Sequence, residues 1–245
     1  MRIVTLRRIL SAIVLGAAVA SAGEGWETDW AKARARAAAE NRPILIDFTG
    51  SDWCGWCVRL KKEVLDQEAF VTYAAENLVL MEADYPRQTP QSPEMKAQNA
   101  ALQKEFGVTG FPTLFLVDAE GRPFARTSYR PGGAEAYVGY LKALLEIRAA
   151  RDAALAKAAG AAGLERAQAL VEALAAVQTD VLRFYAPTIA EIQTLDPENQ
   201  TGFRTRLAEM ELMDVENGVR RLGRSGRQAE ALALVDAFIA KHSPA

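Results

Sequence analysis

Short runs of apolar residues, separated by polar turns, mark the first half of the chain and predict β-strands. Residues 44–48 form a β-branched and aliphatic run that fits a buried strand, and residues 78–84 form a second run. Two further runs, at 113–117 and 124–128, flank the segment 118–122, which carries Asp, Glu and Gly. This arrangement is typical of a β-hairpin.

Helical spacing of apolar residues alternates with these strands. It predicts helices at 30–40, 94–106 and 133–148, and Gly107 stands where the C-terminal cap of the second helix is expected. A further helix is predicted at 58–65, after the first strand and a polar turn. The order strand, helix, strand, helix, hairpin, helix predicts an α/β fold, with a central mixed sheet flanked by helices on both faces.

From about residue 151 the chain becomes alanine-rich and the pattern becomes purely helical. Five apolar residues follow helical spacing: Leu164, Ala167, Val171, Leu174 and Val181. Turn-forming residues interrupt later helices, and the final pair is expected around 215–222 and 228–240. We therefore expect an all-α region of four helices in hairpins at 151–245, following an α/β domain at 23–150. Without a cysteine or an acid–base cluster, this region is expected to contact a partner or a second copy of the chain.

The N-terminal 22 residues have the pattern of a signal peptide. Arg2, Arg7 and Arg8 precede an apolar run at 9–19, and residues 20–22 fit a small-x-small cleavage site. The apolar run is shorter than the roughly 18 residues that a membrane-spanning helix needs. The sequence thus predicts export, to a bacterial periplasm, without stable membrane insertion after cleavage.

Composition and charge exclude one broad class of function. The chain has 245 residues, 50% of them hydrophobic, and a formal net charge of −2. This length is enough to bury one large core or two modest ones. Because nucleic-acid-binding proteins normally carry a basic excess, we expect no nucleic-acid partner.

The two cysteines of the chain, Cys54 and Cys57, stand in a Cys-x-x-Cys arrangement. A closed zinc or iron–sulfur site needs about four good ligands, and only His242 could join the pair, so no metal is expected. Haem attachment requires His directly after the second cysteine, where Val58 stands. A structural disulfide that closes so short a loop adds little stability. Of these interpretations of the cysteine pair, redox chemistry remains, and it needs no further cofactor.

The spacing of Cys54 and Cys57 suits reversible disulfide formation if both lie in the first turn of the predicted helix. Residues three apart on a helix share a face, with Cα atoms about 5 Å apart, within the range of about 4.4–6.8 Å that a disulfide allows. The unpaired N–H groups of the helix N-terminus favour a thiolate at Cys54. We predict that Cys54 is the nucleophile and Cys57 the resolving thiol.

Three motifs in combination resemble the thioredoxin superfamily. They are Asp47-Phe48 on the first strand, Trp53-Cys54-Gly55-Trp56-Cys57 at a helix start, and Gly110-Phe111-Pro112-Thr113 before a strand. The resemblance covers roughly residues 26–147 and is strongest to exported bacterial thioredoxin-like proteins related to disulfide isomerases. It implies a thioredoxin-like fold, protein thiols and disulfides as substrates, and a redox partner that resets the cysteine pair.

The resemblance also implies which residues bind the substrate. Pro112 would be a cis-proline beside the cysteines whose neighbouring backbone pairs with a substrate strand, and Phe111 before it is bulkier than usual. Trp53 matches a tryptophan that shields the site, with a core aromatic as the alternative. Gly55 and Trp56 form the dipeptide between the cysteines, which tunes the redox potential. These five residues are the candidate substrate-binding set.

Asp47 matches the buried acid beneath the cysteines, which in thioredoxins moves a proton to and from the resolving thiol. The sequence departs from the family pattern here, because the turn between Asp47 and Cys54 is one residue longer and Leu80 stands where a lysine often partners the acid. Two interpretations stay open. Asp47 is either a third catalytic residue or a strand carboxylate with satisfied hydrogen bonds, since an unpartnered buried acid is costly.

Two classes of function follow from these observations. The preferred hypothesis is an exported thiol-disulfide oxidoreductase, a protein disulfide reductase or isomerase, that uses Cys54 and Cys57. The alternative is a peptide-binding or scaffolding protein in which the C-terminal helices dock a partner and redox turnover is secondary. The presence of both cysteines favours the enzyme, because a binding module needs neither thiol.

Overall fold

A four-stranded mixed sheet forms the centre of the first half of the chain. The computed structural model describes residues 25–242, so the predicted signal peptide lies outside the described residues. The strands are β1 (Ile44–Thr49), β2 (Val79–Asp84), β3 (Thr113–Val117) and β4 (Pro123–Thr127). Their order is β2-β1-β3-β4, with β1 parallel to β2 and antiparallel to β3, and with β4 antiparallel to β3. All four predicted strands and the hairpin are confirmed.

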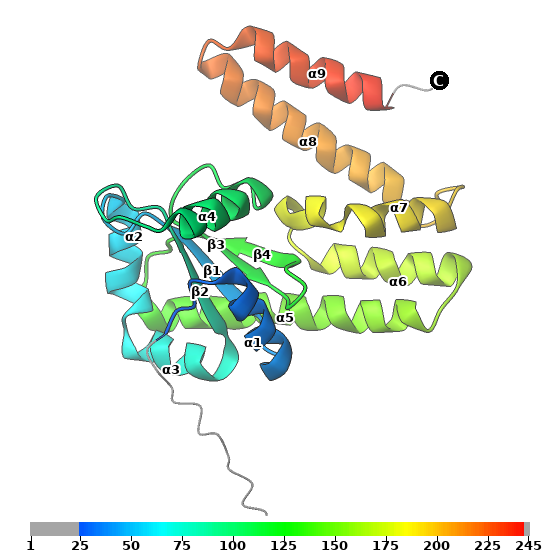
Figure 1. The fold of residues 1–245 in the computed structure, drawn as a ribbon. Helices are drawn as coiled ribbons and strands as arrows, with labels where there is room; N and C mark the ends of the chain where they lie inside the picture. Colours follow the sequence, from blue (N-terminus) through cyan, green and yellow to red (C-terminus); the bar gives the residue numbers. More distant parts are fainter. Residues whose placement is uncertain (1–24, 243–245) are drawn as a thin grey trace, which may run out of the picture.

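Helices cover both faces of this sheet, which confirms the predicted fold class (Figure 1). They are α1 (Trp30–Glu40), α2 (Gly55–Leu60), the π-helical turn η1 (Lys61–Leu65), α3 (Glu68–Asn77), α4 (Pro93–Glu105) and α5 (Gly133–Ala159). Because both faces are covered, every residue of β1 is buried. Gly107 has φ of 55°, as a residue that follows a helix C-cap often does.

Helix α3 was not predicted from the sequence. It begins after Gln67, whose side chain makes no capping hydrogen bond, so the usual start signal is absent. Its buried residues, Phe70 and Ala74, lie four positions apart and face the core, and the helix packs against α5. Without a cap and with one short turn of apolar spacing, the segment has too weak a pattern to stand out.

The second half of the chain is helical, as predicted. Its elements are α6 (Gly163–Ala176), the 3₁₀ turn η2 (Thr179–Tyr185), α7 (Ala186–Leu195), α8 (Phe203–Arg224) and α9 (Gln228–His242). Val181, expected in the same helix as Leu174, lies instead in η2. The closing helix of the α/β fold, expected to end at 148, continues as α5 to Ala159 and packs against α6.

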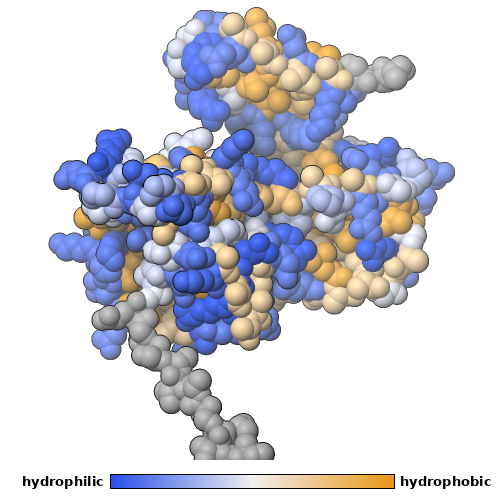
Figure 2. All heavy atoms as spheres, viewed as in Figure 1, coloured by the Kyte–Doolittle hydropathy of each residue, from blue (hydrophilic) through white to orange (hydrophobic). Residues whose placement is uncertain are grey.

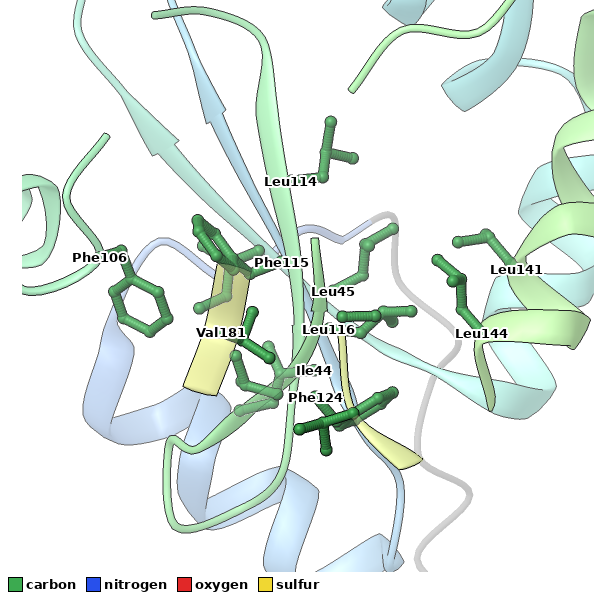
Figure 3. Close-up of a cluster of buried hydrophobic side chains, with 14 of the residues drawn as sticks. Ile44, Leu45, Phe106, Leu114, Phe115, Leu116, Phe124, Leu141, Leu144 and Val181 are labelled. Atoms are coloured by element: carbon green, nitrogen blue, oxygen red, sulfur yellow. The ribbon is translucent and has the colours of Figure 1, made fainter. Parts of the chain in front are cut away.

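One hydrophobic cluster joins the sheet to the first of these C-terminal elements. Figure 3 shows Val181 of η2 in the same cluster as Ile44 and Phe115 of the sheet, and the cluster extends to Leu170 on α6 and Ile192 on α7. The division of the chain at residue 150 stays a prediction. The hydrophobic cluster nevertheless includes residues from both sides of that position.

Polar contacts reinforce this junction. Arg151 on α5, only 1% exposed, lies 3.1 Å from the Asp118 carboxylate and donates a hydrogen bond of 2.9 Å to the Tyr185 hydroxyl. Gln178 accepts a hydrogen bond from the backbone N–H of Arg126 (2.6 Å) and donates its own backbone N–H to Phe124 O (3.3 Å). These bonds cover the free edge of β4 and protect it from pairing with another strand.

The α8–α9 hairpin projects from the rest of the molecule (Figure 1). Gly218 permits the close approach of its two helices, because a Cβ there would lie 2.8 Å from Leu234 Cδ1. His242 pairs with Glu211 at 2.8 Å across the hairpin, rather than being a free tail residue. Within residues 25–242, no helix is long and apolar enough to span a membrane.

Candidate active site around Cys54 and Cys57

Cys54 and Cys57 form a disulfide, with their Cα atoms 5.2 Å apart. Cys54 is the N-cap of α2, with extended backbone, and Cys57 lies in the first turn. The backbone N–H of Cys57 donates to the Cys54 sulfur at 3.2 Å. The prediction that both cysteines lie within the helix is therefore corrected for Cys54, which stands just before it because its side chain caps the helix.

The turn between β1 and α2 is shaped by Gly50 and Trp53. A Cβ on Gly50 would lie 2.5 Å from Cε2 of Trp53, so the indole packs against the backbone where only glycine leaves room. The indole N–H of Trp53 donates to Tyr85 O at 2.7 Å, and the ring lies edge-on to Phe111 at 5.7 Å. Trp53 thus links the cysteine turn to the loop that carries Pro112.

The loop before β3 has the predicted geometry. The peptide between Phe111 and Pro112 is cis. The Thr113 hydroxyl donates to Gly110 O at 2.8 Å, and the Ser128 hydroxyl donates to Pro112 O at 2.8 Å, so the loop is held from both sides. Phe111 of this loop contacts Trp53, the residue before Cys54.

Trp56, between the two cysteines in the chain, is 56% exposed. Its ring is 5.3 Å from that of Tyr129, and the Arg59 guanidinium lies 5.5 Å from the Trp56 ring centre. The Tyr129 hydroxyl donates to the Glu63 carboxylate at 2.6 Å, which fixes this aromatic pair. A Cβ on Gly55 would meet no atom within 4 Å, so this glycine leaves the surface between the cysteines open.

Asp47 is buried on β1, with 4% of its surface exposed. Its Oδ1 has no hydrogen-bond partner among the described residues, so the interpretation as a fully satisfied strand carboxylate does not match this structure. Burial, together with the nearby Glu82 and Asp84 carboxyls, raises the pKa of Asp47 to about 8. A titration near neutral pH suits a group that exchanges protons.

A cavity of about 210 Å³ is lined by both Asp47 and Cys57. Lys61 and Glu82 also line it. Burial and Asp84 raise the pKa of Glu82 as well. The cavity is large enough to hold water.

Three further residues near the pair were not identified from the sequence. The carboxylate of Asp52 accepts the backbone N–H groups of Arg87 (2.9 Å), Gln88 (2.7 Å) and Thr89 (3.0 Å). These bonds, the one from Arg87 above all, lower the pKa of Asp52. The Arg87 guanidinium then lies 3.9 Å from the Trp53 ring centre. Tyr129 is the third such residue, and no local motif marks any of them, because they meet only through the fold.

Comparison with known proteins agrees with this geometry. A family model of the thioredoxin-like domain matches residues 30–143. The disulfide bond reductase DsbH of Chlamydia pneumoniae is 38% identical over 130 residues, which cover 53% of this chain and 78% of DsbH. The thioredoxin-related protein DsbJ of the same organism is 32% identical over 101 residues, 41% of this chain but only 29% of DsbJ.

Other relatives are matched over a smaller part of their length. The thiol:disulfide interchange protein DsbD of Yersinia enterocolitica is 33% identical over 96 residues, 38% of this chain and 15% of DsbD. A solved structure of a DsbH oxidoreductase is 38% identical and covers 50% of this chain and 84% of its own, with a TM-score of 0.48. Helices α6 to α9 lie outside the family model.

The fold, the disulfide at the start of α2 and these relatives define the class of protein. The chain belongs to the thioredoxin superfamily. It is a thiol-disulfide oxidoreductase, like the disulfide bond reductase and the thiol:disulfide interchange protein that it resembles.

Proposed function

We propose that this chain is an exported reductase of disulfides in protein substrates, with Cys54 as nucleophile and Cys57 as resolving thiol. The observation that carries the assignment of roles is the position of Cys54 as the N-cap of α2, where its sulfur accepts the Cys57 N–H. Such N–H groups stabilise a thiolate. The direction, reduction, is supported by the 38% identity to a disulfide bond reductase over 78% of that protein.

The reaction begins with the reduced pair. The Cys54 thiolate attacks one sulfur of the substrate disulfide, which forms a mixed disulfide and releases the other substrate cysteine as a thiolate. The Cys57 thiolate then attacks the Cys54 sulfur, which forms the Cys54–Cys57 disulfide and releases the second substrate thiolate. Two electrons pass from the pair to the substrate, and a dithiol partner protein must return them before the next turnover.

Asp47 supplies the proton acceptor for the second step. Cys57 attacks only as a thiolate, so its thiol proton must leave as the mixed disulfide is resolved. The Asp47 carboxylate, which lines the same cavity as Cys57, takes this proton through water held in the cavity. A pKa of about 8 lets the carboxyl both accept and return a proton near neutral pH.

The substrate chain lies across the surface around the disulfide. Phe111 and Pro112 offer the backbone for pairing, while Trp53, Gly55 and Trp56 offer contacts. The exposure of Trp56 and the open space at Gly55 support this placement. The edge-on contact of Trp53 with Phe111 supports a shared aromatic platform.

Export to a bacterial periplasm and a contact through the C-terminal helices complete the proposal. Export is supported by the sequence pattern of residues 1–22. A contact with a partner or a second copy is supported by exposed hydrophobic side chains on the α8–α9 hairpin, where Figure 2 shows a hydrophobic area. They are Leu212, Met213, Leu232, Leu234 and Ile239.

Two cysteine variants test the assigned roles. With a protein disulfide substrate and dithiothreitol as electron source, Cys54→Ser is expected to abolish catalysed reduction. Once reduced and freed of dithiothreitol, Cys57→Ser is expected to accumulate a mixed disulfide with the substrate through Cys54, visible on a non-reducing gel. Substrate reduction retained by Cys54→Ser, or a mixed disulfide formed through Cys57 in its place, would contradict the assignment.

A further inference from the structure

We propose that a groove beside Pro112 binds an acidic segment of the substrate polypeptide, next to the cystine that Cys54 attacks. This inference rests on the proposed function, because it names the substrate class of the same site. The groove is open and has a volume of about 500 Å³. Phe111 and Pro112 line one part of it, and Arg126, Arg130 and neighbouring residues line the rest.

The groove is continuous with the surface around the disulfide. Ser128, which lines it, donates its hydroxyl to Pro112 O, and the next residue, Tyr129, lies 5.3 Å from the Trp56 ring. A polypeptide that pairs with the loop at Pro112 therefore passes Tyr129 and meets Arg130 within a few residues of its reacting cysteine. The groove therefore contacts the substrate residues that flank the cystine.

Two exposed arginines give the groove a positive charge. Arg130 lies with its guanidinium carbon 4.0 Å from the ring centre of Tyr140, another lining residue, and this stacking orders the side chain while leaving its N–H groups available. In the described part of the chain, Arg130 forms no salt bridge. Arg126 projects from the edge strand β4 into the same groove.

The only carboxylate among the lining residues is Asp180 on η2. Its oxygen lies 3.8 Å from Nη1 of Arg126, a long contact between side chains that are 49% and 41% exposed. Such a pair is weak and is easily exchanged for a substrate carboxylate. The groove thus keeps a positive excess although the whole chain has a net charge of −2.

This arrangement favours carboxylates over other side chains. Guanidinium groups present paired donors that match the two oxygens of a carboxylate, whereas a lysine on the substrate would be repelled by both arginines. Because the groove is open to water, the preference is moderate and falls as salt screens it. We expect a disulfide with acidic flanks to react about tenfold faster than one with basic flanks at low ionic strength.

Matched peptides test this inference. Three peptides carry the same single intramolecular disulfide, flanked by two Glu, two Gln or two Lys residues. The rate constant for oxidation of the reduced protein by each peptide is measured by stopped-flow tryptophan fluorescence. Each rate is divided by that of dithiothreitol with the same peptide, which removes the effect of the flanks on disulfide reactivity itself.

The reduced protein is expected to react about tenfold faster with the Glu peptide than with the Lys peptide, with the Gln peptide between them. Half-molar salt should remove most of this difference. Arg130→Glu is expected to lower the ratio of Glu to Lys rates about tenfold, and Asp180→Asn to raise it. Lys104→Glu, an exposed charge change on α4 outside the groove, serves as the matched control and is expected to leave the ratio unchanged.

Equal rates with the three peptides, or a ratio that Arg130→Glu does not change, would overturn the acidic-segment inference while leaving the proposed function intact. If none of the peptides oxidises the reduced protein faster than it oxidises dithiothreitol, both the inference and the proposed function fail. These two results are distinguishable in the same experiment.

Discussion

Asp47 on β1 lies directly opposite Glu82 on β2 in the parallel register, so two carboxyl groups share one side of the sheet beneath the cysteine pair. Burial of Asp47 and the proximity of Glu82 both favour its neutral form. A protein retains so costly an arrangement where the raised pKa is useful. We propose that it supplies a proton acceptor for Cys57, which lines the same cavity.

Replacement of Asp47 by Asn is expected to stabilise the protein at alkaline pH. The pKa of Asp47 in the folded protein is raised to about 8. Protonated Asp47 therefore contributes its full stabilisation below the pKa it has in the unfolded chain, and this contribution is lost as pH rises through about 8. The wild type should therefore lose stability between about pH 4 and 9 relative to Asp47→Asn, by on the order of 3 to 5 kcal/mol. Urea unfolding at several pH values measures the difference.

Asp66→Asn is the control for this pH dependence. Asp66 is exposed and pairs with Lys61 at 2.7 Å, so the loss of its charge should change stability little at any pH. A difference between Asp47→Asn and the wild type that is the same at pH 5 and pH 9 would show that Asp47 titrates as an ordinary carboxyl.

Replacement of Gly50 by Ala is expected to destabilise the protein by roughly 1 to 3 kcal/mol. The new methyl group would overlap the indole of Trp53, which must move and lose its hydrogen bond to Tyr85 O. Chemical denaturation measures the loss, and a change in tryptophan fluorescence of the folded state should accompany it.

Gly55→Ala provides a matched comparison. Its Cβ would meet no atom within 4 Å, so we expect a change in stability of less than about 1 kcal/mol. Equal effects of the two substitutions would contradict the packing described for Trp53.

Replacement of Arg151 by Met is expected to cost roughly 1 to 3 kcal/mol, because the buried Asp118 carboxylate loses its ion-pair partner on α5 but keeps the one to Arg122 at 2.9 Å. The hydrogen bond to the Tyr185 hydroxyl is lost at the same time. Because the pair joins the hairpin turn to α5 and η2, thermal unfolding should also become less cooperative.

Lys157→Met on the same helix is the control for Arg151. Lys157 pairs with Glu172 at 3.0 Å, and both side chains are more than half exposed. Loss of this pair should therefore lower the stability by about 1 kcal/mol or less. If Arg151→Met were no more harmful than Lys157→Met, the buried pair would contribute nothing to the junction.

The sequence predicted the strands, the cysteine chemistry and the cis-proline because each depends on a local pattern or a motif. Helix α3 was not predicted because Gln67 gives no N-cap signal. The burial of Arg151 could not be predicted from the sequence, for a different reason. An arginine in an alanine-rich helix normally faces solvent, and here Tyr185 of η2 together with Asp118 and Phe124 of the β3–β4 hairpin surround it.

The same limit applies to the active site. Asp47 could be placed on its strand, but its lack of a partner at Oδ1 depends on side chains from β2 and η1. Asp52 and Tyr129 reach the site through contacts with residues more than thirty positions away in the chain. Contacts of this kind are set by the topology of the sheet and not by spacing along the sequence.

The equilibrium redox potential of the Cys54–Cys57 pair tests the proposed reductase most directly. Trp53 and Trp56 lie beside the cysteines, so their fluorescence can follow the titration of the purified protein against dithiothreitol or glutathione buffers. A reductase should have a potential near about −270 mV, close to that of thioredoxin. A value of about −120 to −180 mV would indicate an oxidase or isomerase and would contradict the proposed direction of electron transfer.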